Sequence, residues 1–341
     1  MKILFLTKSW PTIGGVETWL RDMVTGLRQQ HFEVEVWIAG GGKKQAADDY
    51  LAAYPEIRGS VIRPRNLFAS QKWRAIKKVL FDTKPDVVIP VMLADALYQA
   101  ANLKREMDFR ILYPVHEHGN GAMADVANYG SAMDAILCAD RLTLDSISSV
   151  VPETRVLHIP CGVSWSKSPD AVKSLTDRVP VVGFCGRLEQ GAKRATDLIR
   201  FYRELIHARR HFKLLIAGEG ALRSQLESKI SSSRSIDVSF LGGLSRDQLD
   251  QKFYPKIDYL LITSDSETGP LVAFEAMARK RLVITSNFLG RAYNGELIDR
   301  ENCLVFPVGD MQKACSCILE LEKDPLLRVF MQENGHAHFL A

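Results

Sequence analysis

The sequence predicts an α/β protein built from two Rossmann-like domains, each with a parallel sheet between layers of helices. Short apolar runs typical of buried strands alternate with helix-length segments along the whole chain, and they fall into two successive series. Strands separated by helices need crossover connections, which favour parallel sheets covered on both faces. The 341 residues, of which 46% are hydrophobic, are enough for two cores of ordinary size.

The first series opens with a buried strand over Ile3–Thr7 and a helix over Val16–Gln30, in which Leu20, Val24 and Leu27 recur at helical spacing. Its further expected strands are Val34–Ala39, Val87–Val91, Ile111–Val115, Ala135–Cys138 and Val156–Ile159. The second series comprises Val181–Cys185, Lys213–Ala217, Val238–Leu241, Tyr259–Ile262, Leu282–Thr285 and Leu304–Phe306.

The two series are joined by a stretch, Cys161–Pro180, that is rich in serine and proline and has little apolar periodicity. We therefore expect two domains, at residues 1–162 and 163–341. Ligands of open α/β sheets bind beyond the carboxyl ends of the strands. Two facing sheets thus predict an active site in the cleft between the domains.

The composition indicates in which compartment the protein works and which partners are excluded. Six cysteines are scattered without a CxxC pair, which indicates thiols in a reducing compartment. The N-terminal apolar run is too short for a signal peptide, and no segment is apolar for long enough to span a membrane. We expect a soluble, cytoplasmic protein. A formal net charge of +4 is too small to indicate nucleic acid as a partner.

The most informative segment runs from Glu267 to Glu275, directly after the strand Tyr259–Ile262. Gly269 and Pro270 favour a helix entry, because a proline at the first helical position gives up only an N–H that has no partner. The N–H groups of that first turn and the helix dipole favour an anion. Carboxylates repel phosphate but accept hydrogen bonds from hydroxyls. One carboxylate before the helix and one inside it therefore suit a nucleotide sugar, which has a phosphate group between two sugars.

Further motifs precede this segment in a fixed order. They are the glycine loop Pro11-Thr12-Ile13-Gly14-Gly15-Val16-Glu17, Val115-His116-Glu117, Ile159-Pro160-Cys161-Gly162-Val163, Gly186-Arg187-Leu188 with Lys193, Ala217-Gly218-Glu219-Gly220, and Phe240-Leu241-Gly242. Together with the segment from Glu267 to Ala278, the series resembles the retaining glycosyltransferases of family 4, which have the GT-B fold. Each motif alone is weak, but the ordered series covers nearly the whole chain.

The residues and the resemblance together assign roles. Arg187 and Lys193 lie beyond a strand end, where two cations stabilise the charge that develops on a leaving diphosphate. The resemblance implies that Glu267 contacts the transferred sugar and Glu275 the ribose diol, while His116 faces the donor sugar from the other domain. It further implies nucleotide contacts at Gly14, Gly15, Leu241, Thr268, Gly269, Pro270 and Leu271.

Each of these residues also has a purely structural alternative. Gly14-Gly15 suits a plain tight turn, Arg187 and Lys193 suit ion pairs, Glu267 suits a helix cap, and His116 suits a strand end. We expect no metal and no cofactor. His116 and His118 form an HxH pair without an evident third ligand, and Asp265-Ser266-Glu267 is discounted because the family's own cations hold the diphosphate.

Four positions depart from the family pattern. Arg194 follows Lys193 where glycine is usual, and Lys280-Arg281-Leu282 replaces Gly-x-Pro. Cys161 stands where asparagine is usual, and Cys303 where Asn-Gly is usual. None of these removes a group expected to contact phosphate.

A basic stretch lies in the N-terminal half. Residues 58–84 contain eight basic side chains and one acid, Asp82. A helix here would carry Trp73 and Ile76 on one face and Lys77 and Lys78 on another, which suits an anionic membrane surface or an anionic acceptor. The alternative is an ordinary amphipathic helix that packs its apolar stripe on the sheet. If this helix contacts an anionic membrane, the protein is expected at the inner face of that membrane as a peripheral protein.

The sequence therefore predicts a metal-independent, retaining glycosyltransferase that uses a nucleoside-diphosphate sugar. The donor is expected in the C-terminal domain, and a glycan or lipid-linked acceptor of surface-polysaccharide synthesis in the N-terminal domain. Two alternatives stay open: a nucleotide-sugar epimerase or hydrolase of the same fold, and a degenerate homologue that binds nucleotide without turnover. Four intact residues argue against the degenerate homologue: Arg187, Lys193, Glu267 and Glu275.

Overall fold

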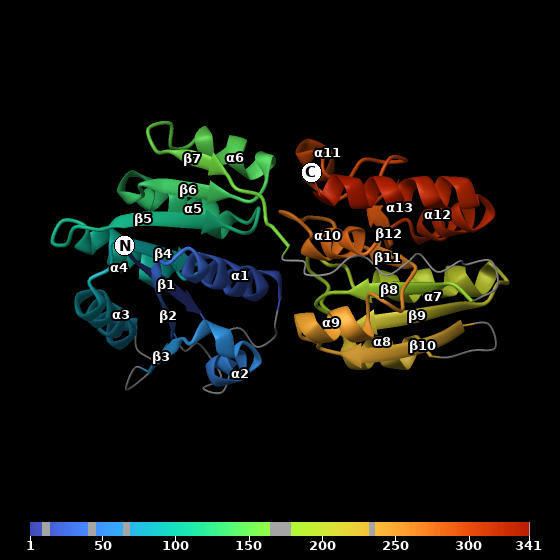
Figure 1. Ribbon diagram of the computed structural model, residues 1–341, viewed down its shortest axis with the longest axis horizontal. Helices are drawn as coiled ribbons and strands as arrows, with labels where there is room; N and C mark the ends of the chain where they lie inside the picture. The colour runs from blue at the N-terminus through green and yellow to red at the C-terminus, as the bar shows by residue number, and fades with distance from the viewer. Residues whose placement is uncertain (9–13, 40–45, 64–68, 164–178, 232–235, 341) are drawn as a thin grey trace. The chain divides into compact units, whose positions relative to one another are not determined.

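The computed structural model describes residues 1–8, 14–39, 46–63, 69–163, 179–231 and 236–340 (Figure 1). The chain divides into two compact units, Met1–Cys161 (unit 1) and Gly162–Ala341 (unit 2). Residues 11–13 of the expected glycine loop and residues 164–178 of the expected junction lie outside the described residues.

Unit 1 has a seven-stranded parallel sheet in the order β3-β2-β1-β4-β5-β6-β7. Its strands are β1 Lys2–Lys8, β2 Glu33–Ala39, β3 Ser60–Ile62, β4 Val87–Val91, β5 Arg110–Val115, β6 Ala135–Cys138 and β7 Val156–His158. Its helices are α1 Gly15–Gln29, α2 Ala46–Ala53, α3 Ala69–Thr83, α4 Ala94–Leu103, α5 Asn120–Tyr129 and α6 Arg141–Ser148, with 3-10 turns η1 Pro55–Ile57 and η2 Gly130–Ala132.

Strand β1 shows why this sheet is buried on both faces. Successive side chains of a strand point to opposite faces, and here both faces meet apolar layers. Leu4 and Leu6 enter one core cluster, which includes Ile76 of α3. Ile3 and Phe5 enter the other, which includes Leu20 of α1. This explains the uninterrupted apolar run that predicted the strand.

Unit 2 has a six-stranded parallel sheet in the order β10-β9-β8-β11-β12-β13. Its strands are β8 Val181–Cys185, β9 Phe212–Ala217, β10 Ile236–Gly242, β11 Tyr259–Ile262, β12 Leu282–Ser286 and β13 Cys303–Phe306. Its helices are α7 Asp197–His207, α8 Arg223–Lys229, α9 Arg246–Lys252, α10 Leu271–Ala278, α11 Arg291–Asn294, α12 Met311–Lys323 and α13 Pro325–Leu340. Apolar clusters again cover both faces.

Every expected strand is present, with bounds that differ from the expected ones by up to two residues, and two further points need correction. The edge strand β3 was not expected, since its three residues include only two apolar ones. Helix α10 begins at Leu271, and Pro270 is its N-cap rather than its first helical residue. The ψ angle of Pro270 is 92°, which is extended, so only its carbonyl belongs to the helix, accepting from the Ala273 N–H at 2.8 Å.

Three loops at the carboxyl edge of the unit 2 sheet are joined by backbone hydrogen bonds. The Gly186 N–H donates to the Ala217 carbonyl at 3.0 Å, and the Gly218 N–H donates to the Gly242 carbonyl at 2.8 Å. Gly218 has a φ of +148°, and a Cβ at this residue would lie 1.9 Å from the Gly186 carbonyl oxygen. Only glycine fits there, so the loops after β8, β9 and β10 are held in one arrangement.

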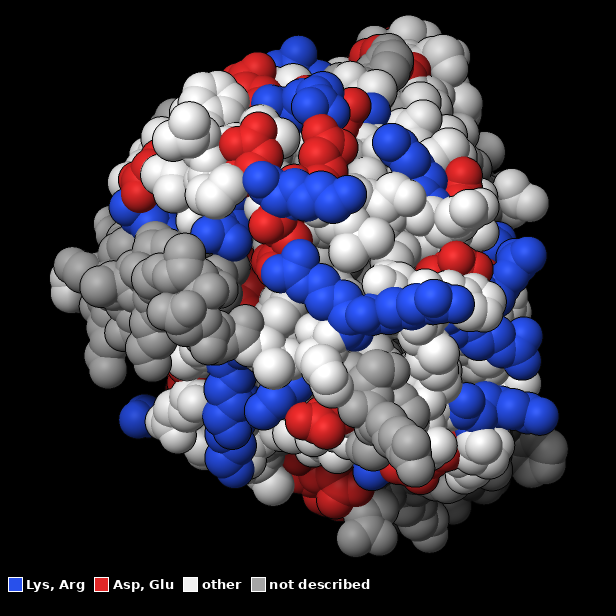
Figure 2. Space-filling view, turned by 90° about the vertical axis from the view of Figure 1, so that its right-hand side faces the viewer, with Lys and Arg blue, Asp and Glu red and all other residues white. Residues whose placement is uncertain are grey.

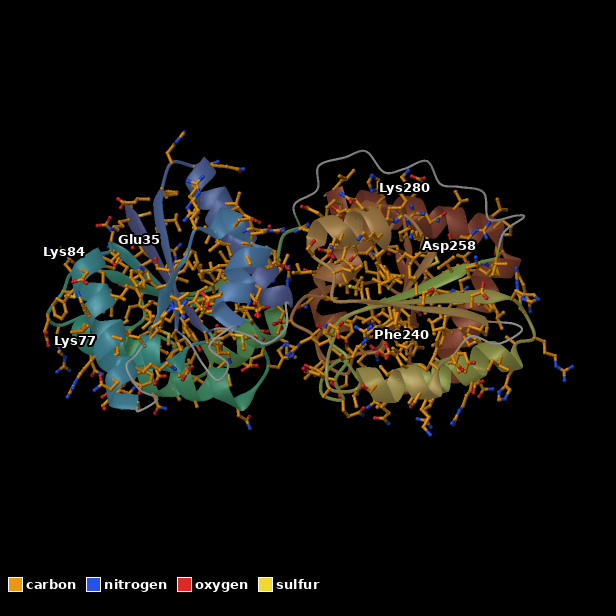
Figure 3. All side chains as sticks on the ribbon, turned by 90° about the horizontal axis from the view of Figure 1, so that it is seen from below. Glu35, Lys77, Lys84, Phe240, Asp258 and Lys280 are labelled. Carbon is orange, nitrogen blue, oxygen red and sulfur yellow. The ribbon has the colours of Figure 1, made fainter. Side chains whose placement is uncertain are left out.

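The amino edge of the same sheet is fixed by a buried carboxylate. Asp258, labelled in Figure 3, accepts from the Val181 N–H at 2.8 Å, and its carbonyl accepts from the Leu282 N–H at 3.0 Å. On the surface of this unit, acidic side chains are interspersed among the basic ones (Figure 2). Arg300, for example, pairs with Glu320 at 2.7 Å.

Candidate functional site

The centre of the candidate site is an ion pair between Lys193 and Glu267. Lys193 lies in the loop between β8 and α7, and Glu267 lies in the loop between β11 and α10. The Lys193 Nζ is 2.6 Å from the Glu267 Oε1. The Ser264 hydroxyl donates to the same oxygen at 2.5 Å. The side chain of Glu267 is only 11% exposed, so both donors hold it in a largely desolvated place.

The two loops that carry this pair are also tied together through their backbones. The Thr263 hydroxyl donates to the Lys193 carbonyl at 2.7 Å, and the Asp265 N–H donates to the Ala192 carbonyl at 2.9 Å. Sequence reasoning found Lys193 and Glu267 but missed Ser264 and Thr263. Their signal was the position just after the strand Tyr259–Ile262, at the sheet edge where ligands bind.

The entry of α10 follows directly after Glu267. Gly269 has a φ of +136°, a conformation that favours glycine, and a Cβ built on it would meet nothing within 4 Å. The backbone is therefore open at the point where the helix begins. The N–H groups of the first turn and the helix dipole make this end of α10 suited to an anion.

Glu275 lies one turn further along α10 and is buried, with 4% of its surface exposed. Burial raises the pKa of its carboxyl group, and the nearby Arg246 guanidinium opposes this shift. Burial likewise raises the pKa of Cys185 to about 12, with Glu275 adding to the shift and Lys193 opposing it. Cys185, at the end of β8, thus lies within electrostatic range of both proposed donor-site residues.

Arg187 does not join the Lys193–Glu267 pair. Its guanidinium is 3.5 Å from the Glu189 carboxylate, and its side chain is 44% exposed. Leu241, near the end of β10, packs its half-buried side chain on the apolar cluster that includes Ala217 and Ile262. The Gly243 N–H, just beyond it, donates to Glu219 at 3.2 Å.

Two of the departures from the family pattern keep the backbone shape that glycine would have. Arg194 has a φ of +47° and Lys280 (Figure 3) has a φ of +54°. The Arg194 guanidinium donates to the buried Asp197 carboxylate at 2.8 Å. Lys280 bonds Glu333, on α13, at 2.6 Å. Arg194 and Lys280 thus adopt, without being glycine, a left-handed backbone of the kind that glycine adopts most easily.

In unit 1, His116 follows β5 and packs edge-on against Trp19 of α1, with 4.4 Å between ring centroids. Burial lowers the pKa of His116 to about 4, so the ring is neutral at pH 7. His118 contacts Asp140 at 3.1 Å, and Asp140 also caps α6 by accepting from the Thr143 N–H at 2.9 Å. The two histidines thus have different surroundings, and no group of three or more metal-ligating side chains occurs among the described residues.

Gly14, the N-cap of α1, has a partner within its own helix. Its N–H donates to the Glu17 carboxylate at 2.9 Å. A phosphate bound at this amide would have to compete with that carboxylate. Gly15 is the first residue of α1 and is exposed.

Helix α3 carries most of the described part of the basic stretch. Ile76, Val79 and Leu80 are buried in the core of unit 1, as an ordinary amphipathic helix requires. Its outer face carries Trp73 and Phe81, which are 36% and 41% exposed. Several polar side chains of the helix already have partners: Trp73 Nε1 with Asp95 at 2.7 Å, Lys72 with Asp95 at 2.5 Å, and Lys77 with Glu106 at 3.9 Å. Among the helices described, none is both long and apolar enough to cross a membrane.

Two family models match the chain. The model described as "Glycosyltransferase Family 4" matches residues 13–166, and the one described as "Glycosyl transferases group 1" matches residues 179–324. Together they cover most of both units.

Individual proteins agree with this. The lipopolysaccharide 1,6-galactosyltransferase of Escherichia coli is 26% identical in an alignment of length 301 that covers 82% of this chain and 77% of that protein. A GDP-mannose-dependent monoacylated alpha-(1-6)-phosphatidylinositol monomannoside mannosyltransferase of Corynebacterium glutamicum is 25% identical in an alignment of length 365, gaps included, that covers 99% of this chain and 93% of that protein. The crystal structure of Anabaena HepE in complex with UDP has a TM-score of 0.75 at 18% identity, covering 99% of this chain and 94% of that one.

The expected GT-B fold is confirmed by the two parallel sheets and by this structural likeness. The two family models match the two units in chain order, residues 13–166 and then 179–324. The chain belongs to the family 4 glycosyltransferases, the glycosyl transferases group 1, and is a nucleotide-sugar-dependent glycosyltransferase.

Proposed function

We propose that unit 2 binds the nucleoside-diphosphate sugar and that transfer proceeds with retention and without a metal. The observation that carries this proposal is the Lys193–Glu267 pair beside the open start of α10. A diphosphate placed there takes Lys193 and the first N–H groups of α10 as partners. Glu267 then accepts from a hydroxyl of the sugar, and Arg187 turns from Glu189 to the leaving phosphate.

The chemistry follows from where charge develops. Cleavage of the sugar–phosphate bond leaves negative charge on the diphosphate, and fixed cations stabilise that charge more in the transition state than in the ground state. Because the loop of Lys193 is held by Thr263 and Asp265, the cation needs little reorganisation. His116, neutral at pH 7, serves as a hydrogen-bonding group for the donor sugar rather than as a cation.

We further propose that unit 1 binds a glycan or lipid-linked acceptor of surface-polysaccharide synthesis. The names of the two curated relatives support this, since one acts on lipopolysaccharide and the other on a phosphatidylinositol mannoside. The outer face of α3 is proposed to contact anionic lipid, because Trp73, Lys77 and Phe81 recur there at a spacing of four residues. The UDP in the HepE structure makes UDP-sugars the first donors to test.

A thermal-shift panel of UDP, GDP, ADP and their common sugar conjugates, with a chelator present, tests the donor site. A ligand at a hundredfold excess over its dissociation constant adds about 2.7 kcal/mol of stability. Stabilisation by one nucleotide series is expected. No shift with any of them would contradict the proposal, and steady turnover of a sugar conjugate without acceptor would indicate a hydrolase instead.

Lys193→Met tests the catalytic assignment. We expect kcat/KM to fall about 10²- to 10³-fold, the range for removing one group that stabilises transition-state charge. Lys213→Met is the matched control, since Lys213 also pairs with an acid, Asp237 at 3.9 Å, but at the start of β9. Equal activity of the two variants would overturn the role of Lys193.

A further inference from the structure

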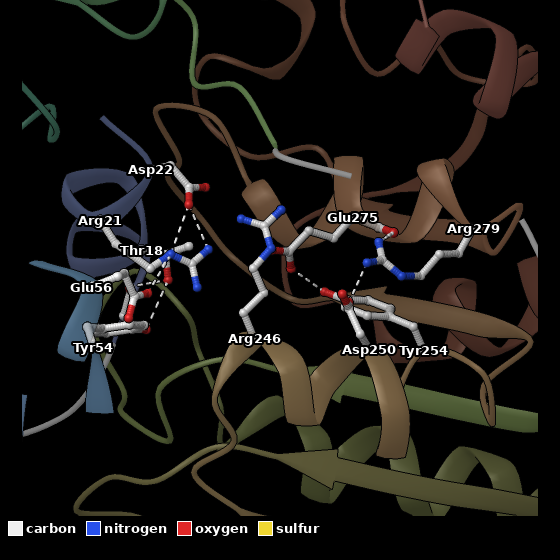
Figure 4. A network of polar contacts seen from close by, with 11 residues as sticks. Thr18, Arg21, Asp22, Tyr54, Glu56, Arg246, Asp250, Tyr254, Glu275 and Arg279 are labelled. Carbon is white, nitrogen blue, oxygen red and sulfur yellow. Dashed lines mark hydrogen bonds and ion pairs between the residues drawn. The ribbon is translucent and has the colours of Figure 1, made fainter. Parts of the chain in front are cut away.

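The Glu275 carboxylate is surrounded by polar groups that the proposed donor chemistry does not explain (Figure 4). The Tyr254 hydroxyl donates to the Glu275 Oε2 at 2.5 Å. Tyr254 follows α9 and is fully buried, and Glu275 is nearly so. Burying a tyrosine hydroxyl and a carboxylate costs free energy unless each has a partner. The bond between them therefore fixes both groups.

A second contact fixes the tyrosine ring. The Arg279 guanidinium carbon lies 4.9 Å from the centroid of the Tyr254 ring. The same guanidinium donates to the Glu275 backbone carbonyl at 2.7 Å and bonds the Asp250 carboxylate. Arg279 thus joins the end of α10 to α9, and Tyr254 is held between them. Its hydroxyl has a defined direction toward Glu275.

The other carboxylate oxygen faces a different group. The Arg246 Nε is 3.9 Å from the Glu275 Oε1, an ion pair too long for a direct hydrogen bond. Between these two contacts of the described residues, the short one is therefore on the Oε2 side, and the Arg246 guanidinium lies further away on the Oε1 side. This asymmetry orients the carboxylate.

We propose that Tyr254 is a positioning residue for nucleotide binding, holding Glu275 by one oxygen so that the other is presented to the ribose diol of the donor. The inference rests on the proposed function, nucleotide binding by unit 2, and on the contact with the ribose diol that the family resemblance implies for Glu275. It adds that this acceptor is aimed by Tyr254, and that Arg279 acts through the tyrosine ring.

Ribose discrimination tests the inference. The affinities of UDP, 2′-deoxy-UDP and 3′-deoxy-UDP are measured by calorimetry for the wild type and for Tyr254→Phe, with the GDP series used if UDP does not bind. A hydrogen bond to a charged group changes affinity by about tenfold to a hundredfold, so the wild type is expected to prefer the ribonucleotide by that factor. Tyr254→Phe is expected to reduce the preference at least threefold, whereas a merely structural loss lowers all three affinities alike.

The chain offers a matched control. Tyr259 is also fully buried, and its hydroxyl donates to a buried glutamate, Glu322, at 2.5 Å. Tyr259→Phe removes the same kind of bond from the same unit but at the start of β11, so ribose discrimination should stay at the wild-type value. Should Tyr254→Phe fail to fold, Arg279→Met provides the same readout.

The possible outcomes distinguish a failure of the proposed donor site from a failure of the positioning role of Tyr254. Binding of UDP with ribose discrimination unchanged in Tyr254→Phe, or in Arg279→Met, overturns the inference and leaves the donor site standing. An equal loss of discrimination in Tyr259→Phe overturns it as well. No binding of UDP, GDP or ADP by the wild type overturns the donor site and the inference with it.

Discussion

Glycine substitutions at Arg194 and Lys280 should have opposite effects on stability, although both residues have the same backbone shape. In the folded chain, a residue with a side chain at positive φ is less stable than glycine by roughly 1–2 kcal/mol. Glycine has more freedom in the unfolded chain, which offsets about 0.5–1 kcal/mol of this advantage. At each position, the glycine variant should therefore be more stable than the alanine variant by about 1 kcal/mol. This comparison isolates the backbone, because both variants lack the long side chain.

The contacts of the wild-type side chains decide whether each glycine substitution raises or lowers the free energy of unfolding. Lys280 bonds Glu333, which is 52% exposed, and such a surface pair is worth about 0.2–1 kcal/mol. Lys280→Gly should thus be neutral or slightly stabilising. Arg194 bonds Asp197, whose side chain is 5% exposed, and leaving a buried carboxylate without its partner costs about 1–3 kcal/mol. Arg194→Gly should therefore be destabilising.

Unit 2 needs its own probe, because every tryptophan in the described part of the chain, Trp19, Trp37 and Trp73, belongs to unit 1. Hydrogen exchange of peptides from β12 as a function of denaturant reports on unit 2 directly. In a thermal scan, 1 kcal/mol corresponds to a shift of roughly 2–4 °C for a unit of this size. Glycine variants no more stable than their alanine counterparts at both positions would refute the backbone argument.

Three further predictions follow from the structure. His116 stays neutral in the fold down to a pKa of about 4, whereas in the unfolded chain it takes up a proton near 6.5. The free energy of unfolding of the wild type relative to His116→Phe should therefore fall by up to about 3 kcal/mol as the pH drops from 6.5 to 4, and a difference independent of pH would contradict the burial of the ring. Gly218→Ala should cost about 3 kcal/mol or more, because its Cβ would meet the Gly186 carbonyl. Gly191→Ala, whose Cβ meets nothing within 4 Å, is the control and should stay near wild type. Vesicles of anionic lipid should sediment the protein reversibly with salt and neutral vesicles should not, and Trp73→Ala with Phe81→Ala should weaken this binding; equal binding to both vesicle types would remove the lipid proposal.

The sequence predicts the layout of this protein well because its signals are local. The apolar runs at Val87–Val91 and Tyr259–Ile262 are read directly as buried strands, and the structure gives the same bounds. Strand β3 is not predicted from the sequence, because an edge strand of three residues needs no long apolar run. The start of α10 is misplaced by one residue because proline suits the N-cap as well as the first helical position in φ, and the extended ψ of 92° that makes Pro270 the N-cap is not visible in the sequence.

The site is predictable only in part. Strand ends and glycines indicate where Lys193 and Glu267 lie, since parallel strands bring their carboxyl ends to one edge. The sequence does not show that Arg187 pairs with Glu189 or that Glu17 caps Gly14, because both depend on side-chain direction. Tyr254 lies 21 positions before Glu275, and only the folded chain brings the hydroxyl and the carboxylate together.

The contact between Gly218 and Gly186 restricts how this enzyme can be altered. Loops joined backbone to backbone at such short range do not tolerate insertions, and a loop transplanted from a relative would have to match all three at once. Changes of donor preference, in evolution or in the laboratory, are therefore expected through exchange of side chains on an unchanged backbone.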